Sequence, residues 1–110
     1  MVLATVAQVV AMLDRLGIPN AQLMWEDQEP PRPPYAILAP HETMPLRTGG
    51  GVMYDARRYD IELYAKPRDI PLEKRVRAAL DEAEVNYTSD VALDEKGQVA
   101  ITYFSMTLVE

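Results

Sequence analysis

The chain has 110 residues, of which 48% are hydrophobic and 25% are charged, and its formal net charge at pH 7 is -6. This length suits one domain with a single core and excludes a second domain, while the composition is that of an ordinary globular protein. The absence of cysteine excludes disulfide bonds and thiolate chemistry, and the acidic balance argues against a surface that binds nucleic acid.

The first predicted element is an amphipathic helix over residues 4–16. Its apolar residues recur at intervals of three and four, at Val6, Val9, Val10, Leu13 and Leu16. We expect Thr5 to cap this helix, Gly17 to end it in a left-handed conformation, and Pro19 to prevent its continuation. The segment carries neither a basic region nor a small-residue cleavage motif, and Asp14 and Arg15 interrupt it. We therefore expect neither a signal peptide nor a membrane span.

Residues 21–25 form a short predicted strand, and residues 26–34 a surface connection, because prolines at positions 30, 31, 33 and 34 cannot pair in a central ladder. A second apolar strand is predicted over residues 35–39. Residues 40–51 include Gly49, Gly50 and Gly51 and are predicted to be a long loop, mobile in the isolated subunit.

Residues 52–66 form a long predicted strand, in which Tyr59, Ile61, Leu63 and Ala65 occupy the buried face. A second helix is predicted over residues 71–84, with Pro71 at its first position. Its apolar stripe consists of Leu72, Val76, Ala79, Leu80 and Ala83. Residues 85–93 and 98–108 are predicted to pair as a hairpin, with Gly97 at the positive-φ position of the turn.

These elements follow the order αβββαββ and predict one α+β domain over residues 1–110. We expect a single, mostly antiparallel sheet of about five strands with two helices packed on one face. In this arrangement Tyr59, Ile61 and Leu63 face Val76 and Leu80 in the core.

Two places in the sequence carry residue types that bind metals: the histidine His41 and the strand face with Asp60 and Glu62. His41 is the only histidine, so a two-histidine metal site is excluded, and we interpret it as a solvated loop residue. Asp60 and Glu62 share one strand face with Lys66, an arrangement similar to that of metal-dependent nucleases. However, three residues separate Glu62 from Lys66 in place of one, and the acidic balance would repel DNA. We interpret this face as solvated and expect no metal.

Other polar features are interpreted as surface. The triple glycine lacks the lysine-serine ending of a phosphate loop, and the proline run is interpreted as a stiff linker. On the second helix Glu73, Lys74, Arg75, Asp81 and Glu82 are expected to face solvent, with Glu73 paired to Arg77. Trp25 is either a core anchor or an interface residue. No activated nucleophile, ligand set or cofactor fingerprint is present, so we expect neither an enzyme nor a cofactor.

Several segments in order resemble the small head–tail joining or tail-terminator proteins of long-tailed bacteriophages and prophages. These segments are LGIP, PPYAIL, YDIELYAKPRDIPLEKRVRAALDEAEVNY and the closing VAITYFSMTL. The likeness covers most of the chain and lies in the order of the elements and in their pattern of apolar and polar residues. The proline run and the glycine-rich ETMPLRTGGG depart from the polar loops of that family.

The resemblance implies a structural virion protein of the phage neck and tail, made in the bacterial cytoplasm. Such a protein forms a ring, here expected to be a hexamer, at the end of the tail tube, stops tube polymerisation and provides the docking surface for the head. The implied partners are further copies of the chain, the tail tube protein and head connector or adaptor proteins, with no nucleic-acid specificity and no membrane.

The residues expected at contacts with these partners are Trp25, Tyr35, His41, Met44, Leu46, Arg47, Gly49, Gly50, Gly51 and Tyr64. A competing hypothesis is a small non-catalytic ligand-binding or regulatory α+β module. In that case a pocket would lie beneath residues 40–51.

Overall fold

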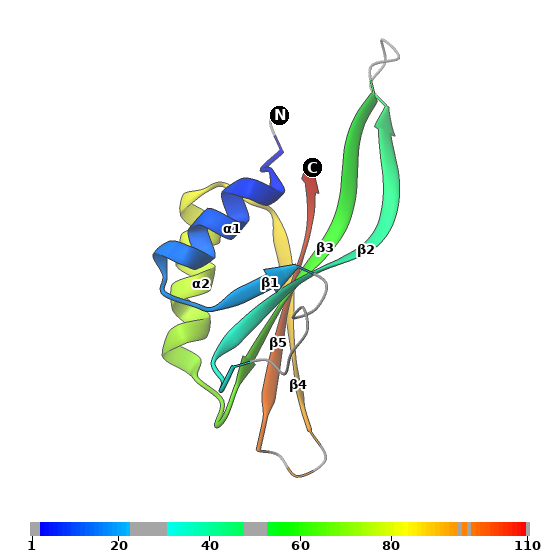
Figure 1. Cartoon of the computed structure of the whole chain (residues 1–110). Helices are drawn as coiled ribbons and strands as arrows, with labels where there is room; N and C mark the ends of the chain where they lie inside the picture. Colours follow the sequence, from blue (N-terminus) through cyan, green and yellow to red (C-terminus); the bar gives the residue numbers. More distant parts are fainter. Residues whose placement is uncertain (1–2, 23–30, 48–52, 95, 97, 110) are drawn as a thin grey trace.

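The computed structural model describes residues 3–22, 31–47, 53–94, 96 and 98–109, with the backbone alone for 41–47 and 53–55. Its elements are α1 (Val6–Arg15), β1 (Asn20–Gln22), β2 (Tyr35–Arg47), β3 (Met53–Ala65), α2 (Ile70–Glu82), β4 (Tyr87–Leu93) and β5 (Ala100–Val109). They form one five-stranded mixed sheet and two helices, which confirms the α+β class. Figure 1 shows both helices on the same side of the sheet.

The strand order in the sheet is β1-β2-β3-β5-β4. β1 runs parallel to β2, while the pairs β2–β3, β3–β5 and β4–β5 are antiparallel. A parallel neighbour needs a long crossover, and residues 23–34 provide the connection between β1 and β2. The sheet is therefore mostly antiparallel, with one short parallel strand at its edge.

The ends of α1 follow the local sequence signals. The Thr5 hydroxyl accepts the Gln8 N–H at 3.1 Å, and the Gln8 side-chain oxygen accepts the Thr5 N–H at 2.9 Å, so both residues form a capping box. Gly17 has φ +74°, its N–H bonds the Asp14 carbonyl, and the Ile18 N–H bonds the Leu13 carbonyl. This is the Schellman geometry, and the predicted start and stop of the helix are confirmed.

The second helix begins one residue earlier and ends two residues earlier than predicted. The Asp69 carboxylate caps α2 by accepting the Leu72 N–H at 3.0 Å. At the other end Glu84 has φ +58°, and the Val85 N–H bonds the Leu80 carbonyl at 3.0 Å. Glu84 therefore lies outside the helix and takes the left-handed position that glycine usually occupies.

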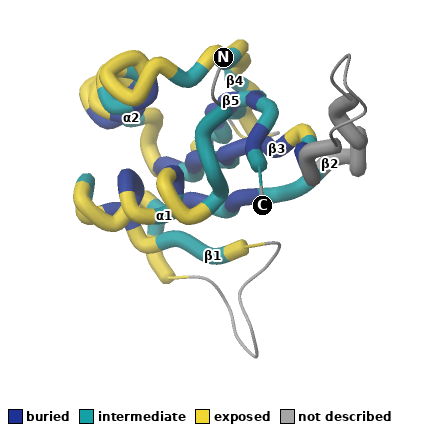
Figure 2. The backbone as a smooth tube through the Cα atoms, turned by 90° about the horizontal axis from the view of Figure 1, so that it is seen from above, coloured by how far each residue is buried: buried dark blue, intermediate teal, exposed yellow. Residues whose placement is uncertain are grey.

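The core lies between the two helices and the sheet. Tyr59, Ile61 and Leu63 belong to the same buried cluster as Val76 and Leu80, which confirms the predicted facing of strand and helix. In β5 buried and half-buried residues alternate along the whole strand. Figure 2 shows buried positions of α1 and α2 turned toward the sheet and exposed positions turned outward.

The predicted loop over residues 40–51 is wrong in its extent. Residues 40–47 continue β2, which pairs with β3 as far as Arg47 opposite Met53. Pro40 and Pro45 both lie in this strand, because an edge strand accepts proline wherever the ladder does not need its N–H. Residues 48–52, including the triple glycine, lie outside the described residues. So do residues 23–25 of the first predicted strand and Gly97 of the predicted turn.

Candidate functional site

The face of the sheet opposite the helices, here called the open face, carries an aromatic patch. Strand alternation places it away from the core, because the neighbours Ala36, Leu63 and Thr102 are buried on the helical side. The strand register groups five half-buried side chains here: Tyr35 and Ile37 of β2, Tyr64 of β3, and Ile101 and Tyr103 of β5. Aromatic and aliphatic side chains on an exposed face are typical of interaction surfaces.

Two tyrosines form the centre of this patch. The rings of Tyr35 and Tyr64 stack with centroids 4.7 Å apart and planes inclined by 13°. The Tyr64 hydroxyl donates a hydrogen bond of 2.9 Å to Oε1 of Glu62. Burial raises the pKa of Tyr64, and the hydrogen bond and negative charge of Glu62 raise it further. The ring stacking and the hydrogen bond to Glu62 together hold the two rings in one orientation.

The open face also carries carboxylates, and one of them corrects a prediction. Asp60 was expected to be solvated, but it is 7% exposed and accepts a hydrogen bond from the Ser105 hydroxyl on β5. The register places Glu62 beside Tyr103, and Tyr103 beside Asp90 of β4. A row of acidic and aromatic side chains therefore crosses three strands.

A two-stranded arm projects from the sheet. The last described pair between β3 and β5 joins Ala56 to Val109, whereas β2 and β3 remain paired as far as Arg47 and Met53. Residues 45–47 and 53–55, here called the arm, thus extend past β5, as Figure 1 shows at the upper right. A two-stranded ribbon alone is marginally stable in water, so an arm of this kind gains stability by contact with another surface.

The edge of β2 is partly protected against the addition of another strand. The Ala36 N–H bonds the Pro19 carbonyl at 2.8 Å, which shows that this N–H points away from β3. Because backbone direction alternates along a strand, the nitrogen of Pro40 points the same way, and the bulge between Pro40 and Glu42 brings Pro45 into the same orientation. Both prolines therefore remove outward donors that a new strand would need.

At the opposite edge, a side chain occupies one outward N–H of β4. The Val91 N–H on β4 bonds its neighbour Asp90 at Oδ1, at 2.9 Å, so it does not pair with β5 and is not offered to an added strand. At the other side of the sheet the described part of the edge strand β1 is Asn20–Gln22. Each of these two edges, β2 and β4, thus lacks some of the outward donors that an added strand would use.

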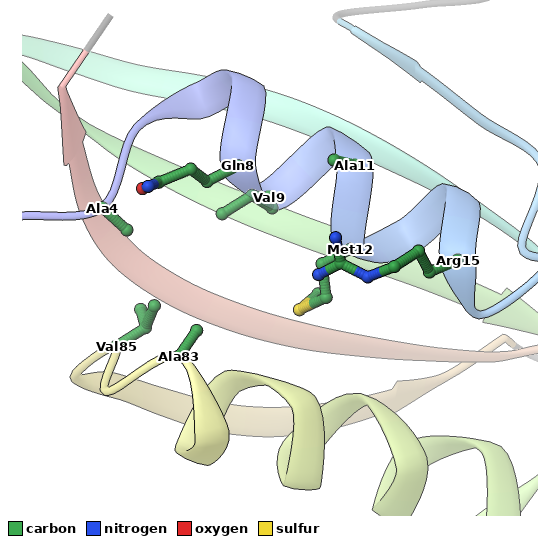
Figure 3. Close-up of a pocket in the computed structure, with 8 residues that line it drawn as sticks. All are labelled: Ala4, Gln8, Val9, Ala11, Met12, Arg15, Ala83 and Val85. Carbon is green, nitrogen blue, oxygen red and sulfur yellow. The ribbon is translucent and has the colours of Figure 1, made fainter.

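A furrow separates the two helices on the other side of the molecule. One cavity of about 360 Å³ is lined by Ala4, Gln8, Val9, Ala11, Met12, Arg15, Ala83 and Val85. A neighbouring cavity of about 440 Å³ shares Met12, Arg15 and Ala83 with it. Figure 3 shows Met12 pointing from α1 toward the end of α2, and the Arg15 side chain running back along α1 beside Met12. The Arg75 side chain donates to the Leu16 carbonyl at 3.3 Å, so a second cation lies at one end of this furrow.

Glu73 corrects the prediction for the polar side of the second helix. It is 2% exposed, and its carboxylate accepts two hydrogen bonds from Arg68, at 2.9 and 3.0 Å. These hydrogen bonds lower its pKa, and further contacts with Thr102 and Arg77 act in the same direction. The predicted partner Arg77 is therefore a minor one, and the main partner precedes the helix.

The structure brings together two of the predicted contact residues, Tyr35 and Tyr64. It places the backbone of His41, Met44, Leu46 and Arg47 in β2, while Trp25, Gly49, Gly50 and Gly51 lie outside the described residues. Sequence reasoning missed Ile37, Ile101 and Tyr103. The alternation of each strand could have put them on the outer face, but only the register between strands makes them one patch.

Among the described residues no three histidine or acidic side chains lie close enough together to hold a metal ion. No helix in the described part of the chain is long and apolar enough to cross a membrane. Comparison of the sequence with models of known protein families and with curated proteins gives no match.

Proposed function

We propose that this chain is a structural protein of a phage or prophage virion, a tail terminator or head–tail joining component. It assembles as a ring, a hexamer, at the end of the tail tube, stops tube polymerisation and offers a docking surface to the head. The likeness of its ordered segments to such proteins carries this assignment. In this proposal it has no catalytic activity of its own and acts in the phage neck after synthesis in the bacterial cytoplasm.

The projecting arm supports an assembling role. A two-stranded hairpin that extends past the rest of its sheet can gain stability by contact with a neighbouring copy or the tube. The predicted contact residues His41, Met44, Leu46 and Arg47 belong to the strand that builds this arm. The partners are then other copies of the chain, the tail tube protein and head connector or adaptor proteins.

Deletion of the gene from the parent phage tests the proposal. We expect tails of abnormal length, or tails and filled heads that fail to join, when the particles are viewed by electron microscopy. Supplying the wild-type gene in trans restores normal particles, and supplying a variant without Gly49–Gly51 does not. Normal infectious particles from the gene deletion contradict the proposal.

A small ligand-binding or regulatory module is the second candidate, and the furrow between α1 and α2 is the observation that favours it. The furrow lies between the helices, whereas that hypothesis expected a pocket beneath residues 40–51. A ligand in this furrow raises the melting temperature of the wild-type protein, and Ala83→Trp, which fills the furrow, abolishes that shift. Normal phage assembly without the gene, together with such a shift, favours this second candidate.

A further inference from the structure

We propose that neighbouring copies meet by unlike faces: the open face of one copy packs on the furrow between α1 and α2 of the next. This inference rests on the proposed ring and identifies the two surfaces that build it. Its partner is a second copy of this chain.

The first step concerns the sheet edges. Prolines withhold outward donors along β2, and Asp90 occupies the N–H of Val91 on β4. Continuation of the sheet from one copy into the next would need these donors. The loss of these donors favours contacts between faces over continuation of the sheet.

The second step concerns symmetry. A ring with more than two copies requires a heterologous contact, in which each subunit presents two different surfaces. The molecule has two such surfaces on opposite sides of the sheet. The open face bears the stacked pair Tyr35 and Tyr64, and the helical side bears the furrow. Subunits that each use both surfaces can add to one another in one direction until the ring closes.

The third step concerns shape. The open face presents large side chains, with Tyr103 and Ile101 beside the tyrosine stack. The furrow is lined by small residues, among them Ala4, Ala11 and Ala83, and is large enough to admit an aromatic ring. Tyrosines are also the residues that most often anchor protein interfaces, since they bury a large area at small entropic cost.

The fourth step concerns charge. The middle of the open face carries Glu62 and Asp90, in one row with Tyr103. The furrow carries Arg15 along its length and Arg75 at one end, and Glu82 is the one carboxylate among the described residues that line it. Arginine stacks on tyrosine rings and also pairs with carboxylates, so the two surfaces are complementary in both respects. Arg58, within β3, and Lys66, directly after it, lie on either side of Glu62 along the chain, outside this row.

Because the chain has no cysteine, a pair of introduced cysteines tests this contact directly. Tyr64→Cys and Ala83→Cys in one chain place thiols on opposite sides of the sheet, where they cannot join within one subunit. Under mild oxidation we expect a ladder of covalent oligomers that ends at the ring size. The matched control pairs Tyr64→Cys with Lys96→Cys, whose second site is an exposed turn residue. Equal cross-linking of both variants, or none, overturns the inference.

Charge reversal gives an independent readout. Glu62→Arg and Arg75→Glu each place like charges across the proposed contact, so each variant alone should associate at least tenfold more weakly than wild type, measured by sedimentation at several concentrations. An equimolar mixture restores the ring, since alternating copies pair opposite charges and an even-numbered ring closes. Lys96→Glu is the control for charge alone.

If the single variants form rings as wild type does, the proposed contact faces are wrong while the ring itself stands. If wild type forms no oligomer and the phage assembles without the gene, the proposed function fails too.

Discussion

Arg68 and Glu73 form a bidentate pair that joins the turn after β3 to the first turns of α2. The carboxylate is buried, while the Arg68 side chain is 43% exposed. A buried carboxylate without its partner would be costly, so this pair fixes where the helix begins relative to the sheet.

The first prediction is a pH dependence caused by this pair. Because the folded pKa of Glu73 lies below its ordinary value of 4.5, its contribution to stability is present above pH 4.5 and is lost as the pH falls through the lower folded value. Thermal melting between about pH 6 and pH 3 should show a steeper fall for wild type than for Glu73→Gln. Parallel curves for the two proteins contradict this assignment. Glu82→Gln, at an exposed position, is the matched control.

The second prediction concerns core packing. Leu80 is 0% exposed and lies in the cluster that joins α2 to β3. Replacing it by alanine should lower the free energy of unfolding by about 2–5 kcal/mol, since the cavity cannot collapse completely. Urea denaturation measures this loss. A change no larger than that of the surface variant Glu82→Ala would refute the assigned role.

The third prediction concerns the end of α2. Glu84 holds a left-handed backbone, with φ +58°, that L-residues adopt at a cost. Glu84→Gly should therefore stabilise the protein by about 0.5–1 kcal/mol, after the greater flexibility of glycine in the unfolded chain is subtracted. Ala78→Gly, inside the same helix, serves as the opposite control and should destabilise by about 1 kcal/mol. Destabilisation by Glu84→Gly would show that losing the Glu84 side chain costs more free energy than relieving its left-handed backbone gains.

The fourth prediction concerns the edge of β2. Pro40→Val combined with Pro45→Thr supplies two outward N–H donors without removing a bond to β3. We expect increased aggregation at high concentration, measured by light scattering and by thioflavin fluorescence, since an unprotected edge accepts another strand. Pro31→Thr, at an exposed position before β2, is the control. Unchanged solubility of the double variant would mean that other features protect this edge.

The fifth prediction concerns the tyrosine pair. The pKa of Tyr64 lies above the ordinary value of 10.0, so any stability due to its protonated hydroxyl is fully present below pH 10.0 and is lost as the pH rises through the raised value. Spectrophotometric titration of wild type should show a late-titrating tyrosine that Tyr64→Phe removes. The loss of an early-titrating group instead would place the Tyr64 hydroxyl in solvent.

Much of the fold follows from local sequence signals, and the exceptions have physical causes. Thr5 and Gly17 were readable because capping depends only on residues within one turn. Residues 40–47 were predicted as loop, although proline excludes only a central strand and not an outward-facing position on an edge. Glu73 was misread because a helix pattern shows polarity but not the partner, Arg68, that allows a carboxylate to be buried.

The candidate site was less predictable than the fold. Tyr35 and Tyr64 were both expected at contacts, yet their stacking depends on the pairing of β2 with β3, which no single strand encodes. Asp60 was expected in solvent because its hydrogen-bond partner, Ser105, lies 45 residues further along the chain. Protection of the sheet edges likewise became visible only once the direction of each N–H was known.

The position of β5 has a consequence for synthesis. β5 lies between β3 and β4 in the sheet, although it is the last strand along the chain, and it carries Phe104, Met106 and Leu108 into the core. Until those residues leave the ribosome, no strand lies between β3 and β4, and the edge of β3 that faces away from β2 remains unpaired. Folding of this domain is therefore completed only after β5 has left the ribosome, and until then the unpaired strand is accessible to chaperones.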